Sequence, residues 1–149
     1  MRRPGLFDEK RWANNWRVVS PEGAVRVDLE RSAARRQALG RKIRDLPVTT
    51  PVVLVATAPR ARAHARAFAT EAAIEVEREY LAFPSAASPA YLVEDAPAPI
   101  RIFLDRILVP PPRSVWSTPI DIGLKILRAL PWRMVRTTAP GRVVVGRRT

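Results

Sequence analysis

Residues 52–83 read VVLVATAPRARAHARAFATEAAIEVEREYLAF, and this stretch decides the fold. Its first five residues are apolar and mostly β-branched, which is typical of a strand buried on both faces. Pro59 suits a first helical turn, and the Ala- and Arg-rich run over 60–73 favours a helix. From Ile74 the apolar residues alternate as they do in a strand. The pattern predicts a right-handed strand–helix–strand unit and therefore an α/β fold.

The composition narrows the range of functions. The chain has 149 residues, 47% of them hydrophobic, which suffices for one domain with a core. It has no cysteine and a single histidine, His64. Disulfides, a cysteine nucleophile and a zinc site are therefore not expected. The absence of cysteine suits a reducing compartment, so the predicted location is the cytoplasm, either free or peripherally at the membrane.

The charge is strongly positive. The formal net charge is +12, and nearly all the basic residues are arginine. One explanation is the codon bias of a GC-rich genome. The other is an anionic partner, such as nucleic acid, a membrane surface or a phosphorylated substrate. No run approaches the roughly 18 apolar residues of a spanning helix, and the N-terminal residues lack the apolar stretch of a secretory signal.

The N-terminal third is less regular. Residues 1–15 show no period and are expected to form an arm before a single α/β domain over residues 16–149. Two short strands are predicted over 16–19 and 24–29, on either side of the turn signal Ser-Pro-Glu-Gly. An apolar stripe over 29–46 then predicts a helix.

The amino-acid composition changes after residue 83. Residues 84–139 are rich in proline and are predicted to form a helical insertion, with its clearest helix over 100–109. The sequence PGRVVVGRR over 140–148 predicts a turn into a closing strand. The expected fold class is therefore a small Rossmann-like α/β sheet with a C-terminal helical insertion and a final edge strand.

Basic and aromatic side chains in two regions are the candidate contacts for an anion or a membrane. Arg31, Arg35 and Lys42 recur at helical spacing on one face of the helix over 29–46, where a solvated face is the ordinary alternative. In the insertion, apolar helix faces bordered by tryptophan and arginine suit a helix lying in a membrane interface. Ordinary core packing is the alternative there. The candidates in the insertion are Arg106, Arg113, Trp116, Arg128, Trp132, Arg133 and Arg136.

Catalytic residues cannot be assigned from a motif. The sequence contains neither a phosphate-binding loop nor a nucleophile elbow. Glu75, Glu77 and Glu79 share one face of the strand predicted from Ile74, where like charges repel. We expect them to face solvent or to meet arginines. Whether the protein is an enzyme is left open.

The order of segments from Val52 onward resembles the C-terminal half of class I S-adenosylmethionine-dependent methyltransferases. In that family a buried strand leads to a helix and a second strand, variable helices follow, and a final antiparallel strand closes the chain, often after a Pro-Gly turn. VVLVATAP, the helix over 60–73, IEVEREY, the Pro-rich segment and PGRVVVGRR take those places over about two thirds of the chain. The resemblance implies S-adenosylmethionine as the cofactor.

The cofactor-binding half of the family pattern is not matched. The family holds its cofactor with a Gly-rich turn after the first strand and an acid ending the second. This sequence has six glycines and no G-x-G, and no Gly-rich turn precedes Asp28, the acid that ends a predicted strand. No cofactor residue can be carried over. The resemblance therefore implies a partial or degenerate member of the family.

Two classes of function follow. The first is a partial or degenerate methyltransferase-like protein that serves as an accessory unit. PSAASPAYLV over 84–93 is similar to segments of surface-polysaccharide proteins, which implies a role in surface-glycan biosynthesis. The second is a basic protein without catalytic activity that binds a membrane surface or nucleic acid. A sheet with so few strands has open edges, so a homo- or hetero-oligomer is expected.

Overall fold

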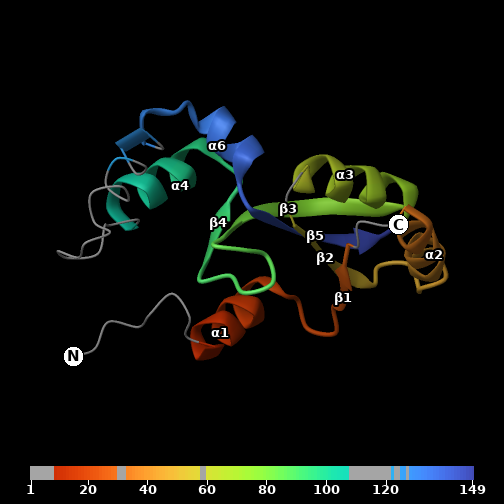
Figure 1. The fold of residues 1–149 in the computed structure, drawn as a ribbon. Coiled ribbons are helices and arrows are strands. Elements are labelled where there is room, and N and C mark those ends of the chain that lie inside the picture. Colours follow the sequence, from red (N-terminus) through yellow and green to blue (C-terminus); the bar gives the residue numbers. More distant parts are fainter. Residues whose placement is uncertain (1–8, 30–32, 58–59, 108–121, 123–124, 127) are drawn as a thin grey trace.

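The computed structural model describes residues 9–29, 33–57, 60–107, 122, 125–126 and 128–149. They form a five-stranded mixed sheet with helices on both faces and a helical insertion at one end (Figure 1). In chain order the elements are α1 (Glu9–Val19), β1 (Val25–Asp28), α2 (Ala33–Arg44), β2 (Pro51–Thr57), α3 (Ala61–Glu71), β3 (Ile74–Phe83), β4 (Tyr91–Glu94), α4 (Pro97–Ile102), the π-helix η1 (Phe103–Ile107), α6 (Trp132–Thr138) and β5 (Gly141–Arg148).

The sheet combines parallel and antiparallel pairs in the order β1-β2-β5-β3-β4. β1 and β2 are parallel neighbours joined through α2. β5 runs antiparallel to both β2 and β3, so β2 and β3 are parallel to one another. The strand, helix and strand predicted within 52–83 are confirmed as β2, α3 and β3. The two strands are not in contact, however, because β5 lies between them.

The prediction that the closing strand lies at the edge of the sheet is wrong. β5 occupies the centre: Gly141 is paired with Thr57 of β2 on one side and with Ala82 of β3 on the other. The run Val143–Val145 explains this position, because consecutive β-branched residues need apolar cover on both faces. The edges are β1 and β4, each only four residues long, and short edge strands limit unwanted pairing.

Alternation along β2 builds a core on each face of the sheet. Val52 and Leu54 pack with the apolar side of α3, whereas Val53 and Val55 point to the opposite face and pack in a cluster that includes Trp16 of α1. Figure 1 shows α3 on one side of the sheet and α1 on the other. Because both faces are covered, the apolar run beginning at Val52 is almost fully buried, as its composition predicts.

The strand predicted over 16–19 is wrong, because these residues end helix α1. The amide of Asn15 donates to the carbonyl oxygens of Pro89 and Ala90, both at 2.9 Å, and so ties the helix to the loop before β4. These tertiary contacts override a short apolar run whose period is ambiguous. Of the expected arm over 1–15, residues 1–8 lie outside the described part of the chain and residues 9–15 belong to α1.

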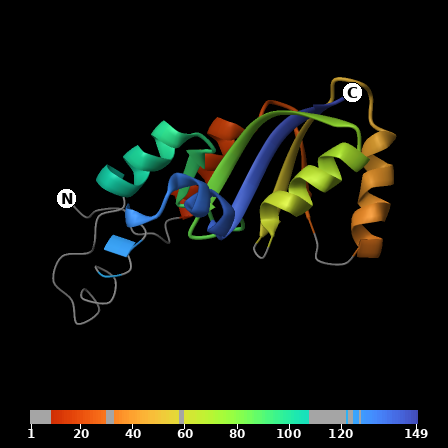
Figure 2. The ribbon, with the colours of Figure 1, turned by 90° about the horizontal axis from the view of Figure 1, so that it is seen from above.

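The predicted helical insertion contains α4, η1 and α6, and Figure 2 shows α4 and α6 gathered at the end of the sheet away from α2. Its own core includes Leu81, Ile100, Phe103 and Val135. The ring of Phe103 stacks on Phe83 of β3 with 4.9 Å between centroids, which anchors the insertion to the sheet. None of the helices in the described ranges has the length and hydropathy needed to cross a bilayer.

Candidate functional site

A buried arginine joins the sheet to the helical insertion. The side chain of Arg142, in β5, is fully buried. Its Nη1 donates to Oε2 of Glu79 at 2.8 Å and to Oδ2 of Asp95 at 2.6 Å, and its Nη2 donates to the carbonyl oxygen of Arg136 at 2.8 Å. One guanidinium group therefore links β3, the end of β4, α6 and β5.

Two further arginines complete this ionic cluster. Nε of Arg66, in α3, donates to Oε1 of Glu79 at 2.8 Å, and its Nη2 lies 2.7 Å from the same oxygen. Nε of Arg136 donates to Oδ2 of Asp95 at 2.9 Å and lies 2.8 Å from Oδ1, which is too poorly aligned to accept a hydrogen bond. The cluster therefore sets three guanidinium groups against two carboxylates.

The cluster keeps Asp95 ionised. Burial alone would raise the pKa of this carboxyl group, because it disfavours the charged form. The hydrogen bonds and positive charges of Arg142 and Arg136 outweigh burial and hold the pKa below its ordinary value. Both carboxylates are thus committed to the arginines around them, and their first role is to hold those arginines in place.

A pocket of about 300 Å³ adjoins the cluster. It lies between the first turns of α3, which follows β2, and the end of α6, which precedes β5. Thr57, at the carboxyl end of β2, is paired with Gly141, at the start of β5. Ligands of α/β proteins commonly bind outside the carboxyl ends of the parallel strands. The residues that line the pocket are Arg60, Arg62, Ala63, Arg66 and Thr137.

Arg62 gives this pocket uncompensated positive charge. Its Nε is buried and has no hydrogen-bond partner in the described part of the chain. Burial lowers the pKa of Arg62, and the neighbouring guanidinium groups of Arg136, Arg66 and Arg142 lower it further. The carboxylate of Glu79 acts in the opposite direction without cancelling these effects. The arrangement suits an anion better than a cation.

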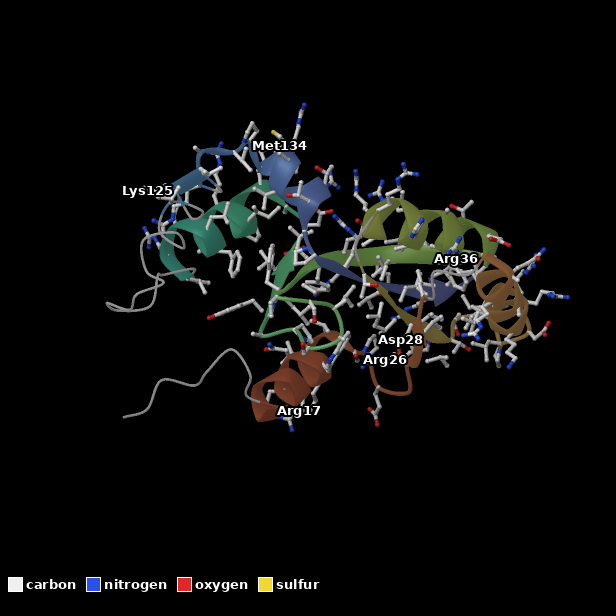
Figure 3. All side chains as sticks on the ribbon, in the orientation of Figure 1. Arg17, Arg26, Asp28, Arg36, Lys125 and Met134 are labelled. Atoms are coloured by element: carbon white, nitrogen blue, oxygen red, sulfur yellow. The ribbon has the colours of Figure 1, made fainter. Side chains whose placement is uncertain are left out.

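The basic residues singled out from the sequence do not form one surface. Arg35 and Lys42 are exposed on α2, and Arg31 lies outside the described residues. Figure 3 shows Arg36 of α2 at one end of the molecule and Lys125 of the insertion at the other. The two groups of candidates would therefore have to contact a partner separately.

Several candidates in the insertion hold the fold together. Nε of Arg128 donates to the carbonyl oxygen of Leu104 at 2.8 Å. Trp132 is half-buried against the core of the insertion. Arg136 is paired with Asp95, and its guanidinium group lies 5.5 Å from the centre of the Trp132 ring. These side chains have structural partners within the chain, as the ordinary alternative of core packing predicts.

The other candidates in the insertion differ in what the structure describes. Arg106, in η1, and Arg133, in α6, are exposed. The guanidinium group of Arg133 lies 5.9 Å from the centre of the Trp132 ring. Arg113 and Trp116 lie outside the described residues. The exposed pair is therefore the part of this group that is open to a partner.

The arginines that converge on the pocket are not marked by any motif in the sequence. Arg62 and Arg66 are four residues apart on the side of α3 away from the core, which reads as an ordinary solvated face. Arg142 carried a better signal, because it interrupts the apolar run of β5 and a buried arginine needs a carboxylate partner. The acid that meets it, Glu79, was expected to meet either solvent or arginines.

Metal binding finds no support in the described residues, where no group of three or more histidine or acidic side chains is placed to hold an ion. The single histidine, His64, is half-buried in α3. The pocket lined by arginines is the candidate site because it adjoins Arg62, whose buried Nε has no hydrogen-bond partner in the part of the chain that the structure describes. No family model, no curated protein and no solved structure matches this chain.

Proposed function

We propose that this protein is a methyltransferase-like α/β protein that acts as an accessory binding unit, in surface-glycan biosynthesis, and lacks its own cofactor site. The order of elements supports this proposal. From β2 onward, two parallel strands connected by helix α3 are followed by a helical insertion and an antiparallel closing strand. This is the order that the resemblance to class I methyltransferases implies for the second half of the family fold.

The positions of the glycines support the absence of a cofactor loop. In the described residues, Gly23 lies in the turn before β1, Gly40 in α2, and Gly141 and Gly146 in β5. None of them follows the carboxyl end of a parallel strand, where a Gly-rich turn lets the backbone approach a cofactor. Gly23 serves the turn, and Gly141 and Gly146 serve the packing of the sheet.

The charge of the candidate pocket carries the proposal of a binding unit. S-adenosylmethionine has a positively charged sulfonium and is a net cation at neutral pH. A pocket at the end of β2 that is lined by Arg60, Arg62 and Arg66 repels such a group. The site at the carboxyl end of this strand is thus better suited to an anion than to the methyl donor.

Titration with S-adenosylmethionine tests this proposal. We expect no binding heat up to about 1 mM cofactor. The pocket repels the sulfonium, and the sequence has no Gly-rich turn that could bind the cofactor elsewhere. The measurement is isothermal titration calorimetry on monodisperse protein whose circular dichroism spectrum shows a folded α/β chain. A micromolar Kd for S-adenosylmethionine would overturn the accessory role and assign the protein an enzymatic one.

Attachment to an anionic membrane is a second candidate, favoured by apolar side chains on the insertion. Ile102, Ile107, Ile122, Ile126 and Met134 are each 47–59% exposed. Ile122 and Ile126 both have helical backbone conformation. Figure 3 shows Lys125 and Met134 projecting outward from the insertion. Apolar side chains that enter the interface, with basic side chains at the headgroups, stabilise such attachment.

Vesicle flotation at low salt tests the membrane candidate. We expect the protein to float with phosphatidylcholine vesicles containing phosphatidylserine and not with pure phosphatidylcholine, because arginine attraction needs anionic lipid. Ile126→Glu should at least halve the floated fraction. Val18→Glu, which also replaces a β-branched apolar residue by glutamate at an 83% exposed site on α1, should not. Absence of flotation with the anionic vesicles removes this candidate.

A further inference from the structure

We propose that the pocket at the start of α3 binds the phosphoryl group of a small soluble ligand, with Arg62 as the principal contact. This inference goes beyond the accessory role and does not depend on the resemblance to methyltransferases. It rests on the charge balance of the ionic cluster, the unpaired Nε of Arg62 and the position of the pocket at the beginning of a helix.

The charge balance leaves positive charge facing the pocket. Glu79 is shared between Arg66 and Arg142, and Asp95 between Arg142 and Arg136. Adding Arg62 gives four guanidinium groups against two carboxylates, an excess of two positive charges. Partly buried charge without a counter-ion is unfavourable. A dianion from solution would supply the missing charge, and a phosphate monoester carries nearly two negative charges at neutral pH.

The contrast with a neighbouring hollow shows that this excess is local. A hollow of about 310 Å³ that Arg66 also lines has side chains of both charges around it. Its basic side chains are those of Arg66, Arg78 and Arg136, and its acidic side chains are those of Glu77, Glu79, Glu94 and Asp95. No acidic side chain appears among the described residues that line the pocket of Arg62. An anion is therefore attracted to the pocket and repelled by the hollow beside it.

The donors in the pocket fit phosphoryl oxygens. A guanidinium group offers a planar fork of donors that matches phosphate in a bidentate manner. Nε of Arg62 is covered by protein atoms and has no acceptor among the described residues, so a phosphoryl oxygen reaches it only when the side chain turns toward the pocket. Arg66 is held by Glu79 through Nε and Nη2, so its orientation is set before a ligand arrives and its remaining donors stay available. Such preorganisation reduces the entropy lost on binding.

The backbone at the start of α3 also favours an anion in this pocket. The pocket borders the first turn of α3, an 11-residue helix with no acidic side chain in that turn. Its N-cap residue, Arg60, has φ of 63° and makes no side-chain capping hydrogen bond. The N–H groups at a helix start and the helix dipole both favour an anion. The hydroxyl group of Thr137 donates to the carbonyl oxygen of Met134. Thr137 therefore lines the pocket without offering this donor to a ligand.

The size of the pocket limits the ligand. About 300 Å³ lies at the lower end of the range for small-molecule sites. It accommodates a phosphoryl or pyrophosphoryl group with a small organic substituent. Nucleic acid would instead contact the outer basic surfaces, and its binding would respond to any exposed arginine. A small phosphorylated ligand should depend on Arg62 in particular.

Calorimetric titration with inorganic pyrophosphate and inorganic phosphate at low ionic strength tests the site. We expect wild-type protein to bind pyrophosphate, and Arg62→Gln to weaken that binding at least tenfold, because a charged hydrogen bond is lost. Arg41→Gln removes the same charge from the exposed face of α2 and should change the affinity less than twofold. Acetate, with a single charge, should bind more weakly than either probe.

A urea denaturation midpoint for each variant distinguishes a binding residue from a structural one. Arg62→Gln should be as stable as wild-type protein or more stable, because it relieves repulsion among the arginines. Pyrophosphate should raise the midpoint of wild-type protein and not that of Arg62→Gln. Flotation with vesicles containing phosphatidic acid distinguishes a lipid headgroup from a soluble phosphate. Three results overturn the proposal: no binding of pyrophosphate, equal weakening of that binding by Arg41→Gln, or binding only to these vesicles.

Discussion

Replacing Asp95 by alanine is expected to lower the free energy of unfolding by about 3–5 kcal/mol, the usual loss when one partner of a buried ion pair is removed. Arg142 would lose an acceptor at 2.6 Å and keep only Glu79 as a charged partner, while fully buried. Arg136 would lose its carboxylate as well. Urea denaturation followed by tryptophan fluorescence measures the change.

An exposed ion pair supplies the control for Asp95. Glu77 lies 2.6 Å from Nε of Arg147, and the two side chains are 41% and 57% exposed. Glu77→Ala should therefore cost less than about 1 kcal/mol. Similar losses for Asp95→Ala and Glu77→Ala would contradict the view that burial makes the cluster essential.

The pH dependence of stability gives a second measure of the same carboxylate. In the folded protein the pKa of Asp95 lies below its ordinary value of 3.8. The unfolded chain therefore binds a proton first as the pH falls. The stability contributed by Asp95 is fully present above pH 3.8 and is lost as the pH falls through the folded-state pKa. Below about pH 4, Asp95→Asn should show a shallower decline in stability than wild-type protein.

Gly146→Ala should destabilise the protein by about 3 kcal/mol, because it overpacks the centre of the sheet. A Cβ atom at this position would collide with the carbonyl oxygen of Glu75 and lie 2.9 Å from Cγ2 of Ile74. Neither obstacle is a flexible side-chain end, since Glu75 contributes backbone and Ile74 is buried. The irregularity in β3 between Val76 and Arg78 adjoins this glycine. Thermal and urea unfolding measure the loss.

The matched control for Gly146 is Gly40→Ala, the same change within α2. Its Cβ would lie 3.8 Å from Cε2 of Phe68, which is ordinary van der Waals contact. Alanine is the better helix former, so this variant should be more stable by about 0.5–1 kcal/mol. The two substitutions therefore have opposite expected signs. A Gly146→Ala protein as stable as wild type would show that β3 and β5 are not so closely apposed.

The local sequence pattern was sufficient to predict β2, α3 and β3 and two further helices. Hydrophobic periodicity predicts each of the three segments: the apolar run beginning at Val52, the helix after it and the alternating strand from Ile74. In each segment the period reflects burial of one or both faces. The helices predicted over 29–46 and 100–109 are confirmed over 33–44, as α2, and over 100–107, as α4 with η1. β4 was missed because four residues hold too short a pattern, and its stability comes from pairing with β3.

The sequence by itself determined the α/β class, the helix between β2 and β3, and an excess of positive charge. Only the tertiary structure decided that β5 lies at the centre of the sheet and that Arg142 is buried. Arg142 meets Glu79 and Asp95, which are 63 and 47 residues away along the chain. Periodicity is a property of neighbouring residues, whereas the pairing of charges and strands depends on contacts between distant segments. Those contacts alone decide which arginines remain without a counter-ion. They therefore also decide where an anion would bind.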